Sequence, residues 1–296
     1  MNVIEIKPNG LCGGVIRAIK MIVDALSDPK TIKPIYMMGN LIHNKHVVNS
    51  FTSQGIILIK DNYYEKLDEI QNGTIIFTAH GISPKIYQKA LDKGLNIIDT
   101  TCPKVLNIHN KIKDLVNNNN KILVIGNENH PEVIGYLGIS DNIKVYQKGM
   151  DTTGFNYVVN QTTLIYDDVL KEFNEIKESN PIITIHEEIC RATKERQFAL
   201  KSWLDKIDCL IVVGDKTSNN CNSLVNLGKS SGISSFLLES VNDLNDYDLT
   251  CFRNIGVTSG ASTPRKVLEE VIDNLKDYNK DKRYVSKLKN SDYLEI

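Results

Sequence analysis

The chain has 296 residues, 41% of them hydrophobic, and a formal net charge of −1. This length can bury a substantial core and form two or three domains, whereas the near-neutral charge and scattered lysines do not predict a nucleic-acid partner. No apolar run approaches the roughly 18 residues needed to span a bilayer, and Glu5 and Lys7 interrupt the start where a signal peptide needs an apolar stretch. We therefore expect a cytoplasmic monomer with no membrane contact.

Short apolar strands alternate with amphipathic helices along the chain, which predicts α/β architecture with largely parallel sheets. After a first strand near Val3–Ile6, strands are expected at 34–37, 56–59, 74–78, 96–99, 121–125, 156–160, 182–185, 208–213, 234–238 and 254–258. Helices are expected at 14–26, 84–93, 103–117, 165–178, 191–205, 220–230 and 263–277. The four asparagines at 117–120 should form a turn. The charged segment after about residue 280 is expected to be either mobile or docked by its tyrosines.

Three cysteines each follow a predicted strand and open a predicted helix. They are Cys12, Cys102 and Cys190, spaced 90 and 88 residues apart. Pro103 suits the first turn of a helix, because that position needs no N–H donor. The positive end of a helix favours the thiolate, which is the form of cysteine that binds metals or attacks substrates. The near-equal spacing predicts three similar units.

Polar residues follow two further strands in each third of the chain, at similar distances from its cysteine. They are His43 and His80 after Cys12, His130 with Glu132 and Thr162 after Cys102, and Ser218 to Asn222 and Ser262 after Cys190. Ligands of α/β sheets gather beyond the carboxyl ends of the strands. If three such units packed around a pseudo-threefold axis, three cysteines and six polar loops would face one cavity. The expected units are 14–100, 101–188, and 1–13 plus 189–280, with a tail at 281–296.

The residues taken singly leave their chemistry open. Three thiolates can hold zinc with a fourth ligand, hold an iron–sulfur cluster, or be unrelated, and no Cys-x-x-Cys pair decides among these. Glu132 can be a first-turn glutamate favoured by the helix dipole, and the loop 216–222 can bind phosphate or simply cap a helix. The remaining cysteines and histidines are expected to be structural or, for the histidines, solvent-facing: Cys209 and Cys251 in the core, Cys221 in helix packing, and His46, His109 and His186.

Nine short segments occur in one order between residue 3 and about residue 275. They are Gly10-Leu11-Cys12-Gly13-Gly14-Val15, Ile42-His43-Asn44, Ala79-His80-Gly81, Thr100-Thr101-Cys102-Pro103, Gly126-Asn127-Glu128-Asn129-His130-Pro131-Glu132-Val133, Gln161-Thr162-Thr163-Leu164, Ile189-Cys190-Arg191-Ala192-Thr193, Ser218-Asn219-Asn220 and Gly256-Val257-Thr258-Ser259-Gly260-Ala261-Ser262-Thr263-Pro264. This combination resembles the 4-hydroxy-3-methylbut-2-enyl diphosphate reductase (IspH/LytB) family of isoprenoid synthesis.

The resemblance implies a trefoil of three α/β units around one 4Fe-4S cluster, with three irons held by Cys12, Cys102 and Cys190 and the fourth iron open for substrate. It implies that Glu132 delivers protons, and that His130 and Thr162 order the pocket around the substrate. The implied diphosphate-binding residues are His43, His80, Ser218, Asn219, Asn220 and Ser262. Asn219 occupies a position that is often serine in the family, and Asn127 replaces another polar residue or histidine.

The reaction implied by the resemblance is the last step of the methylerythritol phosphate (non-mevalonate) pathway. The open iron binds the allylic oxygen, two electrons enter singly through the cluster, and protonation turns the hydroxyl into a water leaving group. Reprotonation gives isopentenyl or dimethylallyl diphosphate. The chain lacks a Gly-x-Gly-x-x-Gly nicotinamide motif, so a ferredoxin- or flavodoxin-type protein is the expected electron donor. The alternatives are a zinc-dependent hydrolase with Glu132 as base and an iron–sulfur redox sensor.

Overall fold

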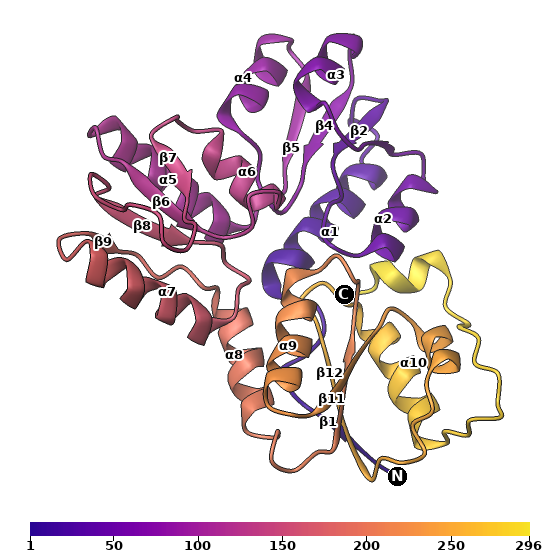
Figure 1. Cartoon of the computed structure of the whole chain (residues 1–296). Coiled ribbons are helices and arrows are strands. Elements are labelled where there is room, and N and C mark those ends of the chain that lie inside the picture. Colours follow the sequence, from indigo (N-terminus) through magenta and orange to yellow (C-terminus); the bar gives the residue numbers. More distant parts are fainter. The chain divides into compact units, whose positions relative to one another are not determined.

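Three four-stranded parallel sheets with surrounding helices make up the protein, in a computed structural model that describes residues 1–296 (Figure 1). This arrangement confirms the predicted α/β class. The chain divides into two compact units, which we describe separately. Unit 1 comprises Met1–Ile16, His43–Phe51 and Arg191–Ile296, and unit 2 comprises Arg17–Ile42 and Thr52–Cys190.

The sheet of unit 1 combines the first strand of the chain with three strands from its last third. Its order is β1 (Asn2–Glu5), β12 (Asn254–Ser259), β10 (Cys209–Val213) and β11 (Ser234–Leu238). The helices are α2 (Lys45–Thr52), α8 (Arg191–Lys201), α9 (Asn219–Ser230) and α10 (Arg265–Lys276), with short 3₁₀ helices η1 (Val241–Asp246) and η2 (Asn290–Leu294). Figure 1 shows α9 and α10 on opposite sides of these strands. Helices therefore cover both faces of this sheet.

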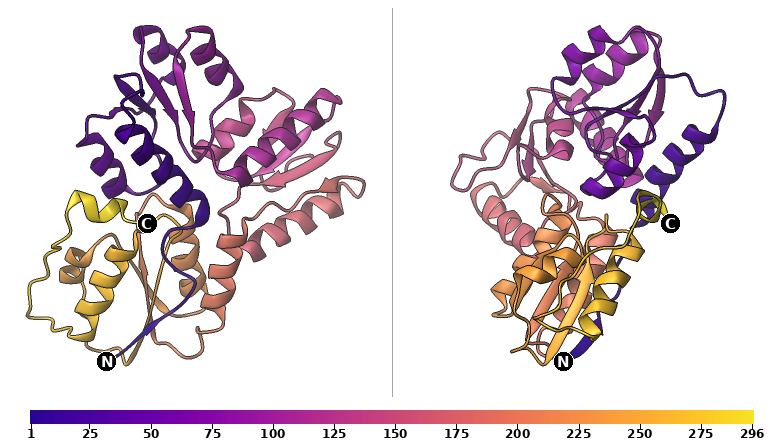
Figure 2. Two further views of the ribbon diagram at one scale, coloured as in Figure 1. Left: turned by 180° about the vertical axis from the view of Figure 1, so that it is seen from behind. Right: turned by 90° about the vertical axis from the view of Figure 1, so that its right-hand side faces the viewer.

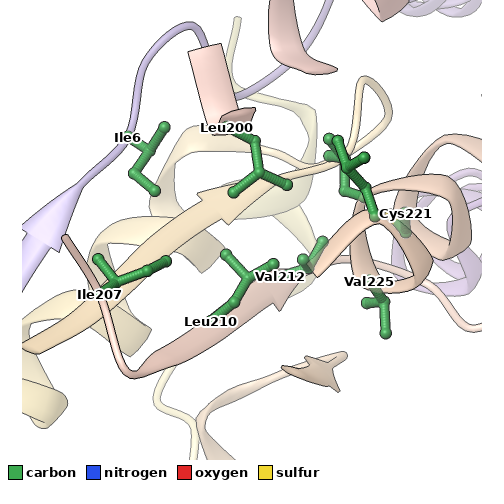
Figure 3. Packing of buried hydrophobic residues seen from close by; sticks show 9 residues of the cluster. Ile6, Leu200, Ile207, Leu210, Val212, Cys221 and Val225 are labelled. Carbon is green, nitrogen blue, oxygen red and sulfur yellow. The ribbon is translucent and has the colours of Figure 1, made fainter. Parts of the chain in front are cut away.

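The core of unit 1 lies between its sheet and the helices α8 and α9. All five residues of β10 are buried, as expected for a central parallel strand with helices on both faces. Leu210 and Val212 of that strand pack with Leu200, Cys221 and Leu224 from the helices (Figure 3). Full burial of such side chains contributes about 1.5–3 kcal/mol each. This packing fixes the start of α9, where several predicted site residues lie.

Unit 2 contains the other two sheets. One has the order β3 (Ile57–Ile59), β2 (Ile35–Met38), β4 (Thr74–Phe77) and β5 (Asn96–Asp99). The other has the order β7 (Ile143–Val145), β6 (Ile122–Ile125), β8 (Tyr157–Asn160) and β9 (Thr184–Ile185). The helices are α3 (Tyr63–Glu69), α4 (Pro84–Asp92), α5 (Pro103–Asn117), α6 (Pro131–Leu137) and α7 (Tyr166–Ser179), and α1 (Gly13–Ser27) begins in unit 1 and continues into unit 2.

The predicted strands and helices are found within a few residues of their expected bounds, with two shortened elements. The helix expected at 191–205 ends at Lys201, because the chain then turns through the bonds Trp203 N to Leu200 O and Lys206 N to Trp203 O before β10 begins. The strand expected at 182–185 keeps only its last two residues. It is an edge strand, and Ile182 before it is 87% exposed. The prediction missed α2, α3, α6 and β7, which are all short.

Two connecting segments behave as the sequence suggests. α5 ends at Asn117, and Asn119 adopts a left-handed conformation (φ 59°) that asparagine tolerates better than most residues. The C-terminal segment is docked by its tyrosines rather than mobile: Tyr284 and Tyr293 are buried, and the Tyr293 ring stacks on His46 at 4.8 Å. Figure 2 shows this yellow segment returning alongside α10. No helix has the length and apolar character required to cross a bilayer.

Candidate functional site

Cys102 occupies the strand-to-helix junction that the sequence predicts. It is the N-cap residue of α5, with Pro103 in the first turn, and its side chain makes no capping hydrogen bond. Its backbone N–H donates to the Ala79 carbonyl at 3.0 Å, so the loop after β4 fixes its position. The residue forms no disulfide and is half-buried. Its sulfur atom lies at the positive end of a 15-residue helix, a position that favours the thiolate form.

Cys12 sits at the corresponding junction before α1. Its N–H donates to the Ala261 carbonyl at 2.9 Å, and its own carbonyl accepts from Ile16 N at 2.9 Å. The preceding Gly10 has φ +75°, donates to the Ser259 hydroxyl at 2.7 Å and accepts from the buried Arg196 guanidinium at 2.7 Å. The Cys12 loop is thus anchored to the end of β12 and to α8 within unit 1.

Cys190 directly precedes α8, and two anchors hold its loop in unit 2. The Cys190 N–H donates to the Thr162 carbonyl at 3.0 Å. Two residues earlier, the buried Glu188 carboxylate forms ion pairs with Lys104 (2.5 Å) and Lys111 of α5. Because Lys104 lies two residues after Cys102, these ion pairs join the loop of one cysteine to the helix of the other.

The remaining three cysteines differ from these in burial. Cys209 and Cys221 are buried, as predicted, and burial raises the pKa of Cys209 to about 12 and that of Cys221 to about 11. The Cys221 sulfur fills the space beside Gly214 and Gly260, where a Cβ on either glycine would lie 2.4 or 2.2 Å from it. The prediction for Cys251 is wrong: it is exposed, because it lies in the turn before β12 rather than in the strand.

The start of α9 gathers polar groups in unit 1. Ser218 is the N-cap residue, and its hydroxyl accepts from Cys221 N at 3.4 Å. Asn219 is the first helical residue and is half-buried. The Asn220 amide is buried, donates to Thr193 Oγ1 at 3.1 Å and accepts from Ala261 N at 3.1 Å. Asn220 thereby connects α9 to α8 and to the loop after β12.

His43 and Ser262 meet in the same unit. The Ser262 hydroxyl donates to the His43 carbonyl at 2.9 Å. Burial lowers the pKa of His43 below its ordinary value, while the Asp215 carboxylate opposes this shift. The imidazole is therefore neutral near pH 7 and offers one N–H donor. Helix termini, hydroxyls, an amide and a neutral imidazole together suit an anion without a cationic side chain.

Two residues that hold this region were not singled out from the sequence. Asn44 is buried, donates to the Ser262 carbonyl at 2.9 Å, and accepts from the N–H groups of His46 and Val47 at the start of α2. Asp215 accepts from Lys45 N at 2.8 Å and from Thr217. The sequence signals were available, since Asp-x-Thr and an asparagine before a helix are common capping patterns.

Glu132 and Thr162 form a buried pair in unit 2. Thr162 donates twice, from its N–H to Oε1 of Glu132 at 2.7 Å and from its hydroxyl to Oε2 at 2.8 Å. Tyr136, one turn later on α6, donates its hydroxyl to Oε1 at 2.8 Å. Burial raises the pKa of Glu132 above its ordinary value, and these three donors reduce the shift by stabilising the carboxylate. A carboxyl group of this kind can hold a proton and release it.

The histidines of unit 2 have distinct environments. Nδ1 of His130 accepts from Glu132 N at 3.2 Å, which leaves the proton of the neutral ring on Nε2. The His80 ring stands edge-on to the His130 ring at 5.7 Å. His109 is buried, as its predicted structural role requires, and burial lowers its pKa to about 4. His186 is half-buried and stacks on Tyr157 at 5.5 Å.

The predicted site residues thus form one group in each unit. Unit 1 contributes Cys12, His43, Ser218, Asn219, Asn220 and Ser262, and unit 2 contributes Cys102, Cys190, His80, His130, Glu132 and Thr162. No set of three His, Cys, Asp or Glu side chains is grouped closely enough to hold a metal ion. Joint ligation by the three cysteines therefore stays a prediction. Asn127 supports the second group through its backbone N–H, which donates to Gln161 Oε1 at 3.1 Å.

Comparisons with known proteins agree along nearly the whole chain. The family model described as "LytB protein" matches residues 3–276. Relatives named 4-hydroxy-3-methylbut-2-enyl diphosphate reductase include one from Geobacillus thermodenitrificans, 38% identical over 94% of this chain and 91% of the relative, and one from Symbiobacterium thermophilum, 36% identical over 94% and 98%.

Two solved structures that resemble this chain are also of diphosphate reductases. The structure of the E-1-hydroxy-2-methyl-but-2-enyl-4-diphosphate reductase from Plasmodium falciparum is 31% identical, covers 99% of this chain and 96% of its own, and has a TM-score of 0.86. A second structure, of an (E)-4-hydroxy-3-methyl-but-2-enyl diphosphate reductase, has a TM-score of 0.65 at 27% identity. The family match spans far more than half of the residues. The chain belongs to the LytB protein family.

Proposed function

We infer that this chain reduces (E)-4-hydroxy-3-methylbut-2-enyl diphosphate to isopentenyl and dimethylallyl diphosphate. The family match over residues 3–276 carries this conclusion, together with relatives that bear the name of this reductase and align over 94% of the chain. The net reaction consumes two electrons and two protons, breaks the allylic C–O bond, forms a C–H bond and releases water. The protein must therefore bind a diphosphate, accept electrons and supply a proton.

We propose that Cys12, Cys102 and Cys190 hold an iron–sulfur cluster. The donor set fits this group, because all three cysteines are outside any disulfide and lie half-buried at the start of a helix, whereas Cys209 and Cys221 are fully enclosed. Three thiolate ligands suit a 4Fe-4S cluster with one iron left open. When bound, such a cluster supplies single electrons and a Lewis-acidic iron for the substrate oxygen.

The group in unit 1 supplies the proposed diphosphate contacts. Its donors are neutral: the hydroxyls of Ser218 and Ser262, the neutral imidazole of His43, and backbone N–H groups at the start of α9. Helix N-termini and hydroxyls bind phosphate groups without a glycine-rich loop. Asn219 and Asn220 complete this set, and His80 of unit 2 is assigned to the same substrate group.

Glu132 is the proposed proton source. Burial raises its pKa and so favours the protonated carboxyl, and its contact with the Thr162 hydroxyl offers a short route for that proton. Transfer of the proton to the allylic hydroxyl converts a poor leaving group into water. His130 orders the start of α6 by accepting from Glu132 N at Nδ1, and we assign its Nε2–H to the substrate.

The direct test is anaerobic purification followed by iron, sulfide and zinc analysis and an assay with chemical reductant and substrate. We expect about four irons and four sulfides per chain, with formation of both products. The electrons are proposed to come from a ferredoxin- or flavodoxin-type protein in the cell. Zinc in place of iron, or hydrolysis of the substrate without reduction, would contradict this function.

A further inference from the structure

The carboxyl group of Glu132 receives its hydrogen bonds unevenly. Oε1 accepts two, from the Tyr136 hydroxyl at 2.8 Å and from Thr162 N at 2.7 Å. Oε2 accepts one, from the Thr162 hydroxyl at 2.8 Å. An oxygen that already accepts two donors has little remaining capacity to carry a proton of its own. In protonated Glu132 the proton therefore belongs on Oε2, next to a hydroxyl that can exchange it.

We propose that Tyr136 is a positioning residue that directs the acid proton of Glu132 to the oxygen beside Thr162. The proposal rests on the proposed role of Glu132 as proton source and adds a residue to it. Without the Tyr136 hydroxyl, Oε1 and Oε2 would each accept one hydrogen bond from Thr162. The proton would then be divided between two oxygens, of which one faces the backbone rather than the hydroxyl.

The surroundings of Tyr136 hold its hydroxyl in place. The residue is fully buried one helical turn after Glu132, in a cluster with Val105, Ile108 and Val133. The His109 ring stands edge-on to its ring at 5.0 Å. Nε2 of His109 has no hydrogen-bond partner, so it does not compete for the tyrosine proton. Burial and the Glu132 carboxylate raise the pKa of Tyr136 well above its ordinary value, which keeps the hydroxyl a donor.

No strong charge overrides these three donors at Glu132. The titratable groups around Glu132 and Tyr136 come from three segments. They are Cys102, Lys104 and His109 at and within α5, His130 at the start of α6, and Glu188 in the loop before Cys190. Lys104 is engaged by the Glu188 carboxylate at 2.5 Å, and His109 is neutral near pH 7 because burial lowers its pKa to about 4. Loss of the Tyr136 hydrogen bond should therefore directly change which Glu132 oxygen carries the proton.

The test is Tyr136→Phe, which removes one oxygen and keeps the ring. We expect turnover to fall about tenfold while the substrate Kd changes less than about threefold, because the effect is on proton delivery. Independently of activity, infrared spectroscopy should show the protonated Glu132 carboxyl band persisting to higher pH, because the lost donor had stabilised the carboxylate.

Two further variants serve as controls. Glu132→Gln identifies the carboxyl band by removing it. Tyr284→Phe is the matched control, since it also loses a buried hydroxyl with hydrogen bonds, to Asn279.

The outcomes separate this inference from the proposed role of Glu132 on which it rests. Near-normal turnover of Glu132→Gln would remove Glu132 from the reaction and overturn both its role as proton source and the role of Tyr136, while leaving the proposed reductase activity in place. An impaired Glu132→Gln together with a Tyr136→Phe variant of normal turnover and unmoved carboxyl band would overturn the role of Tyr136 alone. In a Glu132→Gln background, Tyr136→Phe should cause no further loss. If Tyr136→Phe does not fold, replacing all tyrosines by 3-fluorotyrosine, a stronger donor, should move the band to lower pH, and an unmoved band would refute the proposal.

Discussion

The two groups of candidate site residues handle charge in opposite ways. In unit 1 the group around α9 presents hydroxyls, an amide and a neutral imidazole. Ser262 is bonded to the His43 backbone, and Asn220 is bonded to Thr193 and to the N–H of Ala261. In unit 2 the central residue is a buried carboxyl, Glu132, surrounded by three neutral donors. The first arrangement suits the binding of an anion that brings its own charge. The second suits the storage of a proton, because burial disfavours the carboxylate.

This difference predicts separate functional consequences. Changes in the first group should act on substrate affinity, because the proposed hydrogen bonds to the diphosphate would be present before and during the reaction. Changes in the second group should act on turnover, because the proton moves only during the reaction. Changes at the proposed cluster ligands should be larger than either, because under the proposed function a protein without the cluster would neither bind the allylic hydroxyl nor transfer electrons.

The largest expected effect is the loss of any proposed cluster ligand. Cys12→Ala, Cys102→Ala and Cys190→Ala should each abolish turnover and bleach the anaerobic protein. Cys209→Ala is the control, because Cys209 is buried in β10 and its pKa is raised to about 12. Iron and sulfide analysis together with visible absorbance check this prediction. Equal iron content in all four variants would contradict the ligand assignment.

The next effect is that of Glu132→Gln on turnover. The glutamine oxygen can accept from Tyr136 and Thr162 N, and its NH₂ can donate to the Thr162 hydroxyl, so the local network stays satisfied. Only the transferable proton is lost. We expect turnover to fall by about a hundredfold or more, the usual scale of general acid catalysis. An anaerobic steady-state assay at saturating reductant measures it, and near-normal activity would refute the role.

A smaller effect is expected when Ser218 is replaced. Ser218→Ala should weaken binding of inorganic diphosphate about tenfold, the scale of one hydrogen bond to a charged group. Ser240→Ala is a matched control within unit 1, because both serines are N-cap residues. The Ser240 hydroxyl accepts from Asn242 N at 3.3 Å at the start of η1, and the Ser218 hydroxyl accepts from Cys221 N at 3.4 Å at the start of α9. Calorimetric titration of both variants checks the prediction. Equal affinity in the two variants would exclude Ser218 from the diphosphate site.

The smallest effect concerns stability and pH. Because the pKa of Glu132 is raised in the folded protein, the native state binds the proton more tightly than the unfolded chain. The stability that this provides is complete below the unfolded pKa of about 4.3 and is lost as pH rises through the folded pKa. Glu132→Gln should therefore melt roughly 2 °C or more above the parent protein at pH 8, with little difference near pH 4. Thermal scans at both pH values test this, and the reverse order would contradict it.

Much of this arrangement was predictable from the sequence because parallel strands bring the residues that follow them to one edge. Ile125 of β6 lies opposite Asn160 of β8, so Glu132 and Thr162, which follow these strands, meet although they are 30 residues apart. The helix-opening position of Cys102 followed from Pro103 in the same way. Local patterns were sufficient wherever the element was long and periodic.

The missed features depend on short elements or on packing. Tyr136 is recognisable as a partner of Glu132 only once residues 131–137 are known to form a helix, which places residues four apart on one face. That helix has too few residues for its periodicity to be read. Cys251 was assigned to the core from its neighbour Phe252, but a turn exposes it before β12 begins. Whether Cys251 is buried depends on whether it lies in the strand or in the turn before it. The residue types around Cys251 do not reveal where the strand begins.

The separation of binding from proton delivery is tested most directly by a double-mutant cycle. Substrate Kd and single-turnover rate would be measured anaerobically for Glu132→Gln, Ser218→Ala and the double variant, each with its iron content verified. We predict that the double variant combines the affinity of Ser218→Ala with the rate of Glu132→Gln, because each change acts on a different step. A Glu132→Gln variant that loses affinity as much as rate, or a rate that depends on Ser218 at saturating substrate, would contradict this division.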